Sequence, residues 1–472
     1  MRAEPFVLAL MLTASAATIA STGFDLPARP YQVDLRQLAF QPLPGAKAYT
    51  GVTEHGSGYR LEVPDDWNGD LVVYVVGGAQ YPASRICDPV TKANCVLPGD
   101  APPSAAMPLI REHLIRSHIA WVSPTFREFL ITPKLRALDA IEVADAVRKI
   151  RPEKSGRDFI MGNSLGGLTV QHVLELFPRR FAGGLAGCTG DAAGFTDFFQ
   201  FTLVAMGLVA ADHPEIRAFL QNAKWPLDQS ELIRLAPQTL AALGPDFPYE
   251  RNAQGDAFVK IMRALSGGPR PMFDLGFYNE VKDTIPGYIV RMAGVDSGAR
   301  SFIDNMAVDY RWETRPGEQR SPTEEALNAI VPRFACDPEV CSSAPLSSGQ
   351  TRDLGGVYKL TGKIEVPLME LNALGDMIAF FSGAERYGRE VATSGRSQFL
   401  VQRAIRDRRH CGFNEAEMNE AFDDLAKWVM TGQRPDGDDT GNPAAVAAPS
   451  YGCRFTRGQH DLDYDYPRVC GR

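Results

Sequence analysis

Gly162-Asn163-Ser164-Leu165-Gly166-Gly167 is the stretch that decides the fold of this chain. The apolar run Asp158-Phe159-Ile160-Met161 precedes it, and apolar residues at helical spacing follow in 168–177. This order of strand, Gly-x-Ser-x-Gly and helix predicts a serine on a sharp turn, with its hydroxyl raised above a sheet. The glycines are expected because a side chain would clash there. The alternative, a glycine-rich turn with a bystander serine, does not explain the flanking strand and helix.

Composition fits an ordinary globular protein. The chain has 472 residues, of which 22% are charged and 44% hydrophobic. That length suits one large α/β domain with an insertion. The net charge is −8 and the sequence has no basic block, so we expect no nucleic-acid partner.

The N-terminus resembles a secretory signal peptide spanning residues 1–20. Arg2 is followed by the apolar run Phe6-Val7-Leu8-Ala9-Leu10-Met11-Leu12 and then by small residues, with possible cleavage after Ala16 or Ala20. A buried helix or a membrane anchor is the alternative, but the apolar run is short for a bilayer span. We therefore expect a secreted or periplasmic protein without a stable membrane span.

The eight cysteines agree with export, because an even number in an oxidising compartment suggests disulfides. Local spacing suggests the pairs Cys87–Cys95, Cys336–Cys341 and Cys453–Cys470, which leaves Cys188 with Cys411. A zinc site is the competing interpretation, but the sequence has no Cys-x-x-Cys or Cys/His cluster with ligand spacing.

Predicted strands alternate with predicted helices in two stretches of the chain. The strands are expected at 58–64, 71–76, 119–122, 158–161, 181–186, 366–371 and 398–402, and the helices at 109–117, 134–150, 168–177, 383–391 and 415–430. The run at 71–76 is uninterrupted and apolar, as in a strand buried on both faces. Such alternation predicts a mainly parallel sheet.

The alternation stops between these two stretches, which predicts an inserted domain. Residues 191–360 are helix-rich and aromatic, and we interpret them as a large helical cap inserted after the strand that follows the serine helix. The α/β core then comprises residues 40–190 and 361–431. Residues 432–472 are rich in Gly, Pro and Asp and are expected to form an irregular, disulfide-tied tail.

Ser164 needs a base to remove its proton, and the seven histidines allow a search by elimination. His172 lies on the serine helix and is expected to pack or face solvent. The others, His55, His113, His118, His213 and His460, lie in an early turn, an early helix and its exit, the cap and the tail. His410 follows the last predicted strand, from where an imidazole can reach the serine. A loop histidine beside a structural cysteine is the alternative.

The acid that orients this base should follow a strand between Ser164 and His410. Asp376, in Leu371-Asn372-Ala373-Leu374-Gly375-Asp376, meets that condition. The alternative role for Asp376 is a turn or a helix cap. Glu370 is a poorer candidate because it lies within the strand.

Two backbone N–H groups should stabilise an oxyanion at the same place. Leu165, directly after the serine, is expected to supply one. The second is assigned to Gly78 in the glycine pair after Val76, with Ala79 as the alternative. The alternative is that the glycines serve only the turn.

The order Ser164, Asp376, His410 resembles that of the α/β-hydrolase superfamily. Asp66-Trp67-Asn68-Gly69 and His410-Cys411-Gly412-Phe413 are similar to segments of its secreted bacterial members. This resemblance covers residues 59–430 except the cap. It implies ester or amide hydrolysis through an acyl-enzyme, without a cofactor or metal. Members often have a histidine just before the oxyanion glycine, whereas this chain has Val76.

Three classes of function are compatible with this sequence. The leading hypothesis is a secreted serine esterase or lipase-like enzyme that acts on small-molecule or polymeric esters, with the aromatic cap over Ser164. A serine peptidase of the aminopeptidase type is the alternative, and acyl transfer to another acceptor is a smaller possibility. A non-catalytic binding protein is the third class, but binding alone does not need all three triad groups.

Overall fold

The computed structural model describes residues 35–77, 109–125, 133–151, 154–189, 192–225, 227–281, 304–336 and 360–471. The predicted signal peptide at 1–20, the Cys87–Cys95 pair and Cys341 lie outside these residues. Among the described residues, no helix has the length and apolar character needed to cross a membrane.

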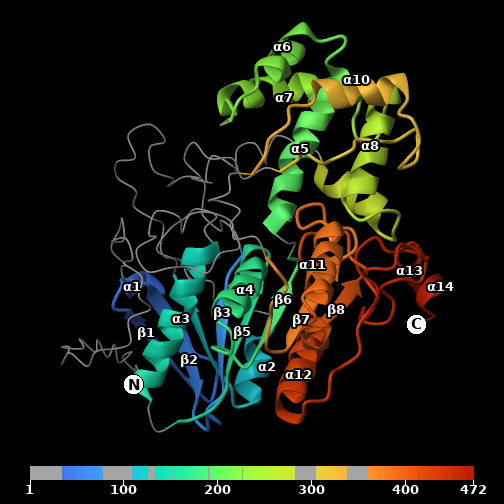
Figure 1. Cartoon of the computed structure of the whole chain (residues 1–472). Helices are drawn as coiled ribbons and strands as arrows, with labels where there is room; N and C mark the ends of the chain where they lie inside the picture. Colours follow the sequence, from blue (N-terminus) through green and yellow to red (C-terminus); the bar gives the residue numbers. More distant parts are fainter. Residues whose placement is uncertain are drawn as a thin grey trace.

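An eight-stranded sheet forms the centre of the fold, in the order β1-β2-β4-β3-β5-β6-β7-β8 (Figure 1). The strands are β1 (Ala46–Val52), β2 (Gly58–Pro64), β3 (Leu71–Val75), β4 (Ala120–Pro124), β5 (Asp158–Asn163), β6 (Gly183–Gly187), β7 (Leu368–Ala373) and β8 (Leu400–Ile405). The pairs from β4 to β8 are parallel, and only the two pairs that include β2 are antiparallel. The predicted mainly parallel sheet is therefore confirmed.

Helices cover both faces of this sheet. Around the core they are α1 (Leu35–Leu38), α2 (Arg111–Arg116), α3 (Pro133–Ile150), α4 (Leu165–Leu176), α11 (Phe381–Thr393) and α12 (Glu415–Thr431). Apolar side chains of α3, α4 and α11 pack on one face, and those of α2 and α12 pack on the other. The residues of β3 are all buried, as the uninterrupted apolar run predicted.

The first strand was not predicted from the sequence. β1 pairs antiparallel with β2 at the edge of the sheet, and its residues are half-buried or exposed. Its sequence, AKAYTGV, has no clear apolar alternation, because an edge strand needs little apolar surface. The predicted strand at 181–186 is shifted, since β6 begins at Gly183.

Helices also fill the segment between β6 and β7, where the cap was predicted. They are α5 (Ala192–Val209), α6 (Pro214–Asn222), α7 (Gln229–Leu243), α8 (Ala253–Leu265), the helical residues 273–281 and α10 (Pro322–Ile330). Figure 1 shows α5 to α10 gathered beyond one end of the sheet. We call the described residues of 192–336 the cap. Its apolar core also includes Met377 and Phe380, which follow β7.

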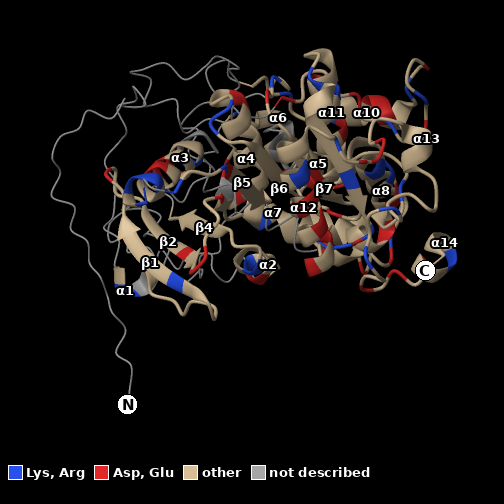
Figure 2. Ribbon diagram, turned by 90° about the horizontal axis from the view of Figure 1, so that it is seen from below, with Lys and Arg blue, Asp and Glu red and all other residues tan. Residues whose placement is uncertain are grey.

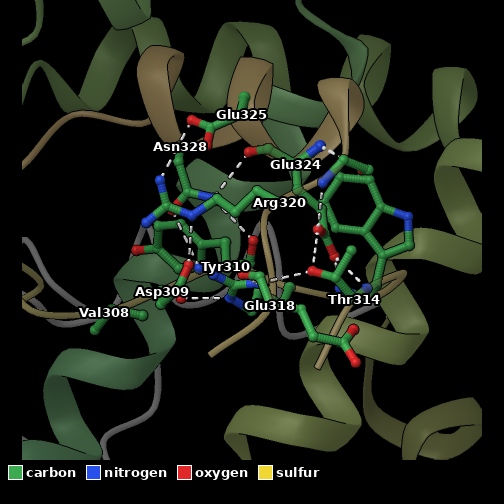
Figure 3. Close-up of polar contacts among 12 residues, drawn as sticks. Val308, Asp309, Tyr310, Thr314, Glu318, Arg320, Glu324, Glu325 and Asn328 are labelled. Carbon is green, nitrogen blue, oxygen red and sulfur yellow. Dashed lines mark hydrogen bonds and ion pairs between the residues drawn. The ribbon is translucent and has the colours of Figure 1, made fainter. Parts of the chain in front are cut away.

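A buried carboxylate organises one loop of the cap (Figure 3). Glu324, in the first turn of α10, accepts hydrogen bonds from the backbone N–H groups of Trp312, Glu313 and Thr314 at 2.7–3.0 Å. Burial alone would raise the pKa of Glu324, but these bonds and the Thr314 hydroxyl hold it well below its usual range. The loop is therefore wrapped around an ionised side chain.

The tail is less irregular than predicted. It contains two short helices, α13 (Pro443–Val446) and α14 (Tyr466–Cys470). The predicted disulfides Cys453–Cys470 and Cys188–Cys411 are both present. Lys/Arg and Asp/Glu residues are interspersed over the described part of the chain, as the view from below in Figure 2 shows.

The turn between β5 and α4 explains the glycines that flank Ser164. Ser164 has φ 58° and ψ −126°, a conformation that costs free energy for a residue with a side chain. A Cβ atom added to Gly166 would lie 2.0 Å from the carbonyl oxygen of Val75, and one added to Gly162 would lie 2.5 Å from it. Both contacts are with backbone, so β3 can approach the turn only where these side chains are absent.

Gly166→Ala is expected to reduce the free energy of unfolding by about 2 kcal/mol or more, since it overpacks a buried contact with backbone. Gly441→Ala is the matched control, because an added Cβ there would have a single neighbour within 4 Å, at 3.8 Å. Urea unfolding of the two variants tests this expectation. Equal midpoints would contradict the steric explanation.

Candidate active site

Ser164 lies at the carboxyl end of β5 and its hydroxyl meets the ring of His410. The Oγ atom of Ser164 is 2.8 Å from Nε2 of His410, although the two residues are 246 positions apart. His410 lies in the loop after β8, and its side chain is 21% exposed. With a neutral ring that is protonated on Nδ1, the hydroxyl donates to Nε2.

Asp376 lies on the other side of this imidazole. Its carboxylate oxygens are 2.8 and 3.0 Å from Nδ1 of His410, and the side chain is fully buried. The backbone N–H groups of Ile378 and Ala379 donate to the same carboxylate at 2.8 Å. Because an ionised carboxylate only accepts hydrogen bonds, Nδ1 must carry a proton that points at Asp376.

The structure thus brings Ser164, Asp376 and His410 together, although they follow three different strands. Five of the six other histidines have partners outside the site: His55 contacts Glu142, His113 contacts Asp423, His118 contacts Asp66, His172 contacts the carbonyl of Leu168, and His213 contacts Gln238. Glu370, the poorer candidate for the acid, is buried within β7 and accepts from Gln171 and Gln402.

The expected oxyanion donors are described only in part. Leu165 is the first residue of α4, where a backbone N–H has no acceptor within the helix. Gly78 and Ala79 lie outside the described residues. Gly77 is described, and a Cβ atom added to it would lie 3.2 Å from Cβ of Ser164. The backbone of Gly77, the first glycine of the pair, therefore packs against Ser164.

Arg136, on α3, contacts the same stretch of backbone. Its guanidinium donates to the carbonyl oxygens of Val76 at 3.0 Å and Gly77 at 3.4 Å. The residue is 4% exposed. It fixes the direction in which these two carbonyl groups point.

The Cys188–Cys411 disulfide lies directly beside the serine and the histidine. Cys188 follows β6, and its Sγ atom is 3.2 Å from the backbone nitrogen of Ser164. Cys411 follows His410 in the chain, and its Sγ atom is 3.5 Å from Nε2 of that ring. The bond therefore ties the loop that carries His410 to the strand next to Ser164.

A cap residue, Glu280, reaches this site. Glu280, at the end of the helical residues 273–281, accepts a hydrogen bond from the backbone N–H of His410 at 2.7 Å and another from Met377 at 3.0 Å. Glu280 was not predicted from the sequence. Glu280 follows the buried Phe277 by one helical turn, so the sequence places a charge at the border of an apolar helix face. Such a position is only a weak indication of a functional residue.

His460, a buried histidine of the tail, supports the loop after β8. His460 is 2.6 Å from Asp407 through Nδ1 and 2.8 Å from Glu417 through Nε2. Asp407 also accepts from the backbone N–H of Arg409 at 2.6 Å, and its own carbonyl accepts from Gly375. This arrangement connects the tail, α12 and the loops that carry Asp376 and His410.

Within the described residues, Cys188, His410 and Cys411 form a group with potential metal-ligand atoms close together. The two sulfur atoms are joined in a disulfide, and the ring is hydrogen-bonded to Ser164 and Asp376. Metal binding by these three residues would require free thiolates and a neutral, accessible ring nitrogen. These three residues therefore do not offer a metal site in this oxidised form.

This chain has the α/β-hydrolase fold. Three features define it: a mainly parallel eight-stranded sheet, a serine at positive φ between β5 and α4, and loops after β7 and β8 that carry Asp376 and His410. Fold class alone does not establish an activity.

Comparison with solved structures finds distant similarities. Feruloyl esterase B from Aspergillus oryzae has 13% identity and a TM-score of 0.42, with 83% of this chain and 81% of that chain covered. Candida antarctica lipase A has 12% identity and a TM-score of 0.37, with 90% and 85% covered. Pyrococcus horikoshii acylaminoacyl peptidase has 9% identity and a TM-score of 0.37, with 84% and 44% covered. No protein-family model and no curated protein matches the sequence.

The long loop that the Cys188–Cys411 disulfide closes predicts a large contribution of this bond to the free energy of unfolding. It closes a loop of 223 residues, whereas Cys453–Cys470 closes one of 17. By loop-closure entropy, replacing both cysteines of the longer loop by serine should cost about 5 kcal/mol, against about 3 kcal/mol for the shorter loop. Urea unfolding of the two double variants measures the difference. A greater loss in the tail variant would contradict this prediction.

His460 predicts a pH dependence of stability. Burial disfavours its charged form, but the bonds to Asp407 and Glu417 outweigh this effect and raise the pKa from 6.5 to about 9. Because the folded pKa is the higher one, the stabilisation is complete below pH 6.5 and is lost as the pH rises through 9.

The variant His460→Gln should therefore lose on the order of 3 kcal/mol of unfolding free energy at pH 6, and much less at pH 10. His213→Gln, in the cap, is the matched control and should cost much less at pH 6, because its partly exposed ring contacts the neutral amide of Gln238. Urea unfolding at several pH values tests both. A His460→Gln deficit that stays constant from pH 6 to 10 would refute the role of the charged ring.

Proposed function

We propose that this chain is a serine hydrolase that cleaves carboxylic esters through an acyl-enzyme. The observation that supports it best is the continuous hydrogen-bonded chain from Ser164 Oγ through both ring nitrogens of His410 to Asp376, with distances of 2.8 Å at each end. A serine hydroxyl acquires nucleophilic character when a base of this kind takes its proton.

In the proposed reaction, Oγ of Ser164 attacks the ester carbonyl carbon as its proton passes to Nε2 of His410. Asp376 remains ionised and stabilises the imidazolium through Nδ1–H. The N–H of Leu165 and a second donor in the Gly78–Ala79 loop would bind the developing oxyanion. Collapse of this intermediate releases the alcohol, which takes the proton from His410.

The second half of the reaction repeats these roles with water. His410 removes a proton from water, the resulting hydroxide attacks the acyl carbon, and the acid leaves as Oγ regains its proton. This sequence consumes one water and one ester, and it uses no redox or metal chemistry. The burial of Asp376, whose side chain is fully shielded from water, supports the proposal because its bond to His410 does not compete with solvent.

The proposed organisation of the chain follows from this function. Residues 1–20 would direct export and be removed, residues 191–360 would cover the sheet end that carries Ser164, and residues 432–472 would support the His410 loop. The two disulfides among the described residues support a secreted or periplasmic location, since such bonds persist in oxidising compartments.

Turnover of p-nitrophenyl esters with graded acyl lengths tests the proposal. Ser164→Ala should reduce kcat/KM at least about 10³-fold, because the nucleophile is lost. Ser230→Ala, at an exposed position in α7, is the matched control and should keep wild-type activity.

A fluorophosphonate probe supplies a readout that needs no correct substrate. It should label wild type and Ser230→Ala but not Ser164→Ala, with the adduct on the peptide that contains Ser164. An unlabelled wild-type protein, or ester turnover that persists in Ser164→Ala, would contradict the proposal.

A further inference from the structure

Glu280 joins the two loops that carry the acid and the base of the proposed triad. One carboxylate oxygen accepts from the N–H of His410 itself, and the other accepts from Met377, the residue after Asp376. These loops follow different strands, and Glu280 belongs to neither of them. A single side chain from the cap therefore fixes the backbone of one loop relative to the other.

The cap segment around Glu280 packs tightly against the Asp376 loop. A Cβ atom added to Gly276 would lie 1.7 Å from the carbonyl oxygen of Gly375. Arg270 donates to the carbonyl oxygen of Leu374 at 2.7 Å and is itself buried. The segment that carries Glu280 is thus seated on the Asp376 loop at several points.

The two bonds of Glu280 require an ionised carboxylate. An ionised carboxylate offers two equivalent acceptor oxygens, whereas a protonated carboxyl or a glutamine amide offers one good acceptor and turns a donor toward the other N–H. The arrangement therefore depends on charge as well as on shape.

Several charged groups surround this carboxylate. Asp376 and His410 face it, and the guanidinium of Arg408 contacts the neighbouring Asn279 while it pairs with Asp461 at 2.7 Å. Burial and the negative charge of Asp376 raise the pKa of Glu280 to about 7, against the opposing effect of the His410 N–H. Glu280 therefore changes its charge close to neutral pH.

We propose that Glu280 is a positioning residue through which the cap holds the imidazole of His410 in line between Asp376 and Ser164. This inference rests on the proposed function of the triad. The contact of Glu280 is with the backbone of His410, so its effect on the reaction passes through the placement and the proton affinity of that ring.

Glu280→Gln removes the charge and one of the two bonds. Loss of alignment should lower kcat roughly 10- to 100-fold with little change in KM. The acidic limb of the pH–rate profile should move to lower pH and become less steep, because it then follows the protonation of His410 alone, whereas in wild type Glu280 loses its charge over the same range. Glu280→Asp keeps the charge but shortens the reach, so it should lower kcat while the acidic limb stays in place.

Glu324→Gln is the matched control. Glu324 is also a buried cap carboxylate that holds several backbone N–H groups, but its bonds are to the loop at 312–314 and to Ser321. This variant should lower the unfolding temperature and leave kcat and the acidic limb unchanged. Glu280→Gln should lower kcat and move the acidic limb, with a smaller loss of unfolding temperature, since burial already disfavours its ionised form.

Nuclear magnetic resonance of labelled histidines gives a readout without substrate. In Glu280→Gln we expect a lower pKa of the His410 ring and a changed Nδ1–H signal, both unaffected in Glu324→Gln. If wild type turns over no ester but these shifts appear, the proposed function fails and the positioning role stands. If Glu280→Gln keeps the wild-type kcat, acidic limb and His410 signals, the positioning role is overturned whatever the substrate.

Discussion

The backbone of Ser164 is held in a conformation that a residue with a side chain adopts only when its surroundings require it. β5 lies between β3 and β6 in the middle of the sheet, so the strand has no room to shift. The N–H of Ser164 donates to the carbonyl of Gly187 at 2.8 Å, and α4 packs its apolar face on the same sheet. The buried sheet thus supplies the stability that offsets the local strain.

The loop that carries His410 is secured from three separate parts of the chain. The disulfide to Cys188 attaches it to the sheet, Glu280 attaches it from the cap, and His460 attaches it through Asp407 from the tail. Each tie uses a different kind of interaction: a covalent bond, a hydrogen bond from the loop backbone to a carboxylate, and a buried pair of ionisable side chains. The proposed active site is therefore a product of the whole chain and not of the sheet alone.

The sequence allowed prediction of those features that leave a local pattern. Ser164, Asp376 and His410 each follow a recognisable strand, so their convergence at one sheet edge could be anticipated. Glu280 and His460 reach their partners across 130 and 53 residues, and no spacing rule connects them. The edge strand β1 was missed because its exposed residues carry no apolar alternation. What escaped prediction was an edge strand without apolar alternation and those side-chain contacts that no strand end or cysteine count indicates.

The bond between Cys188 and Cys411 encloses residues 192–336 in a covalent ring. A protease that cuts the backbone once within residues 192–336 would divide the chain into a segment with Ser164 and a segment with Asp376 and His410. The two segments would still be joined covalently by the disulfide. The nicked molecule would remain a two-chain protein with both halves of the sheet attached. Separation would then require a reducing agent as well as a peptidase, a combination foreign to an oxidising environment.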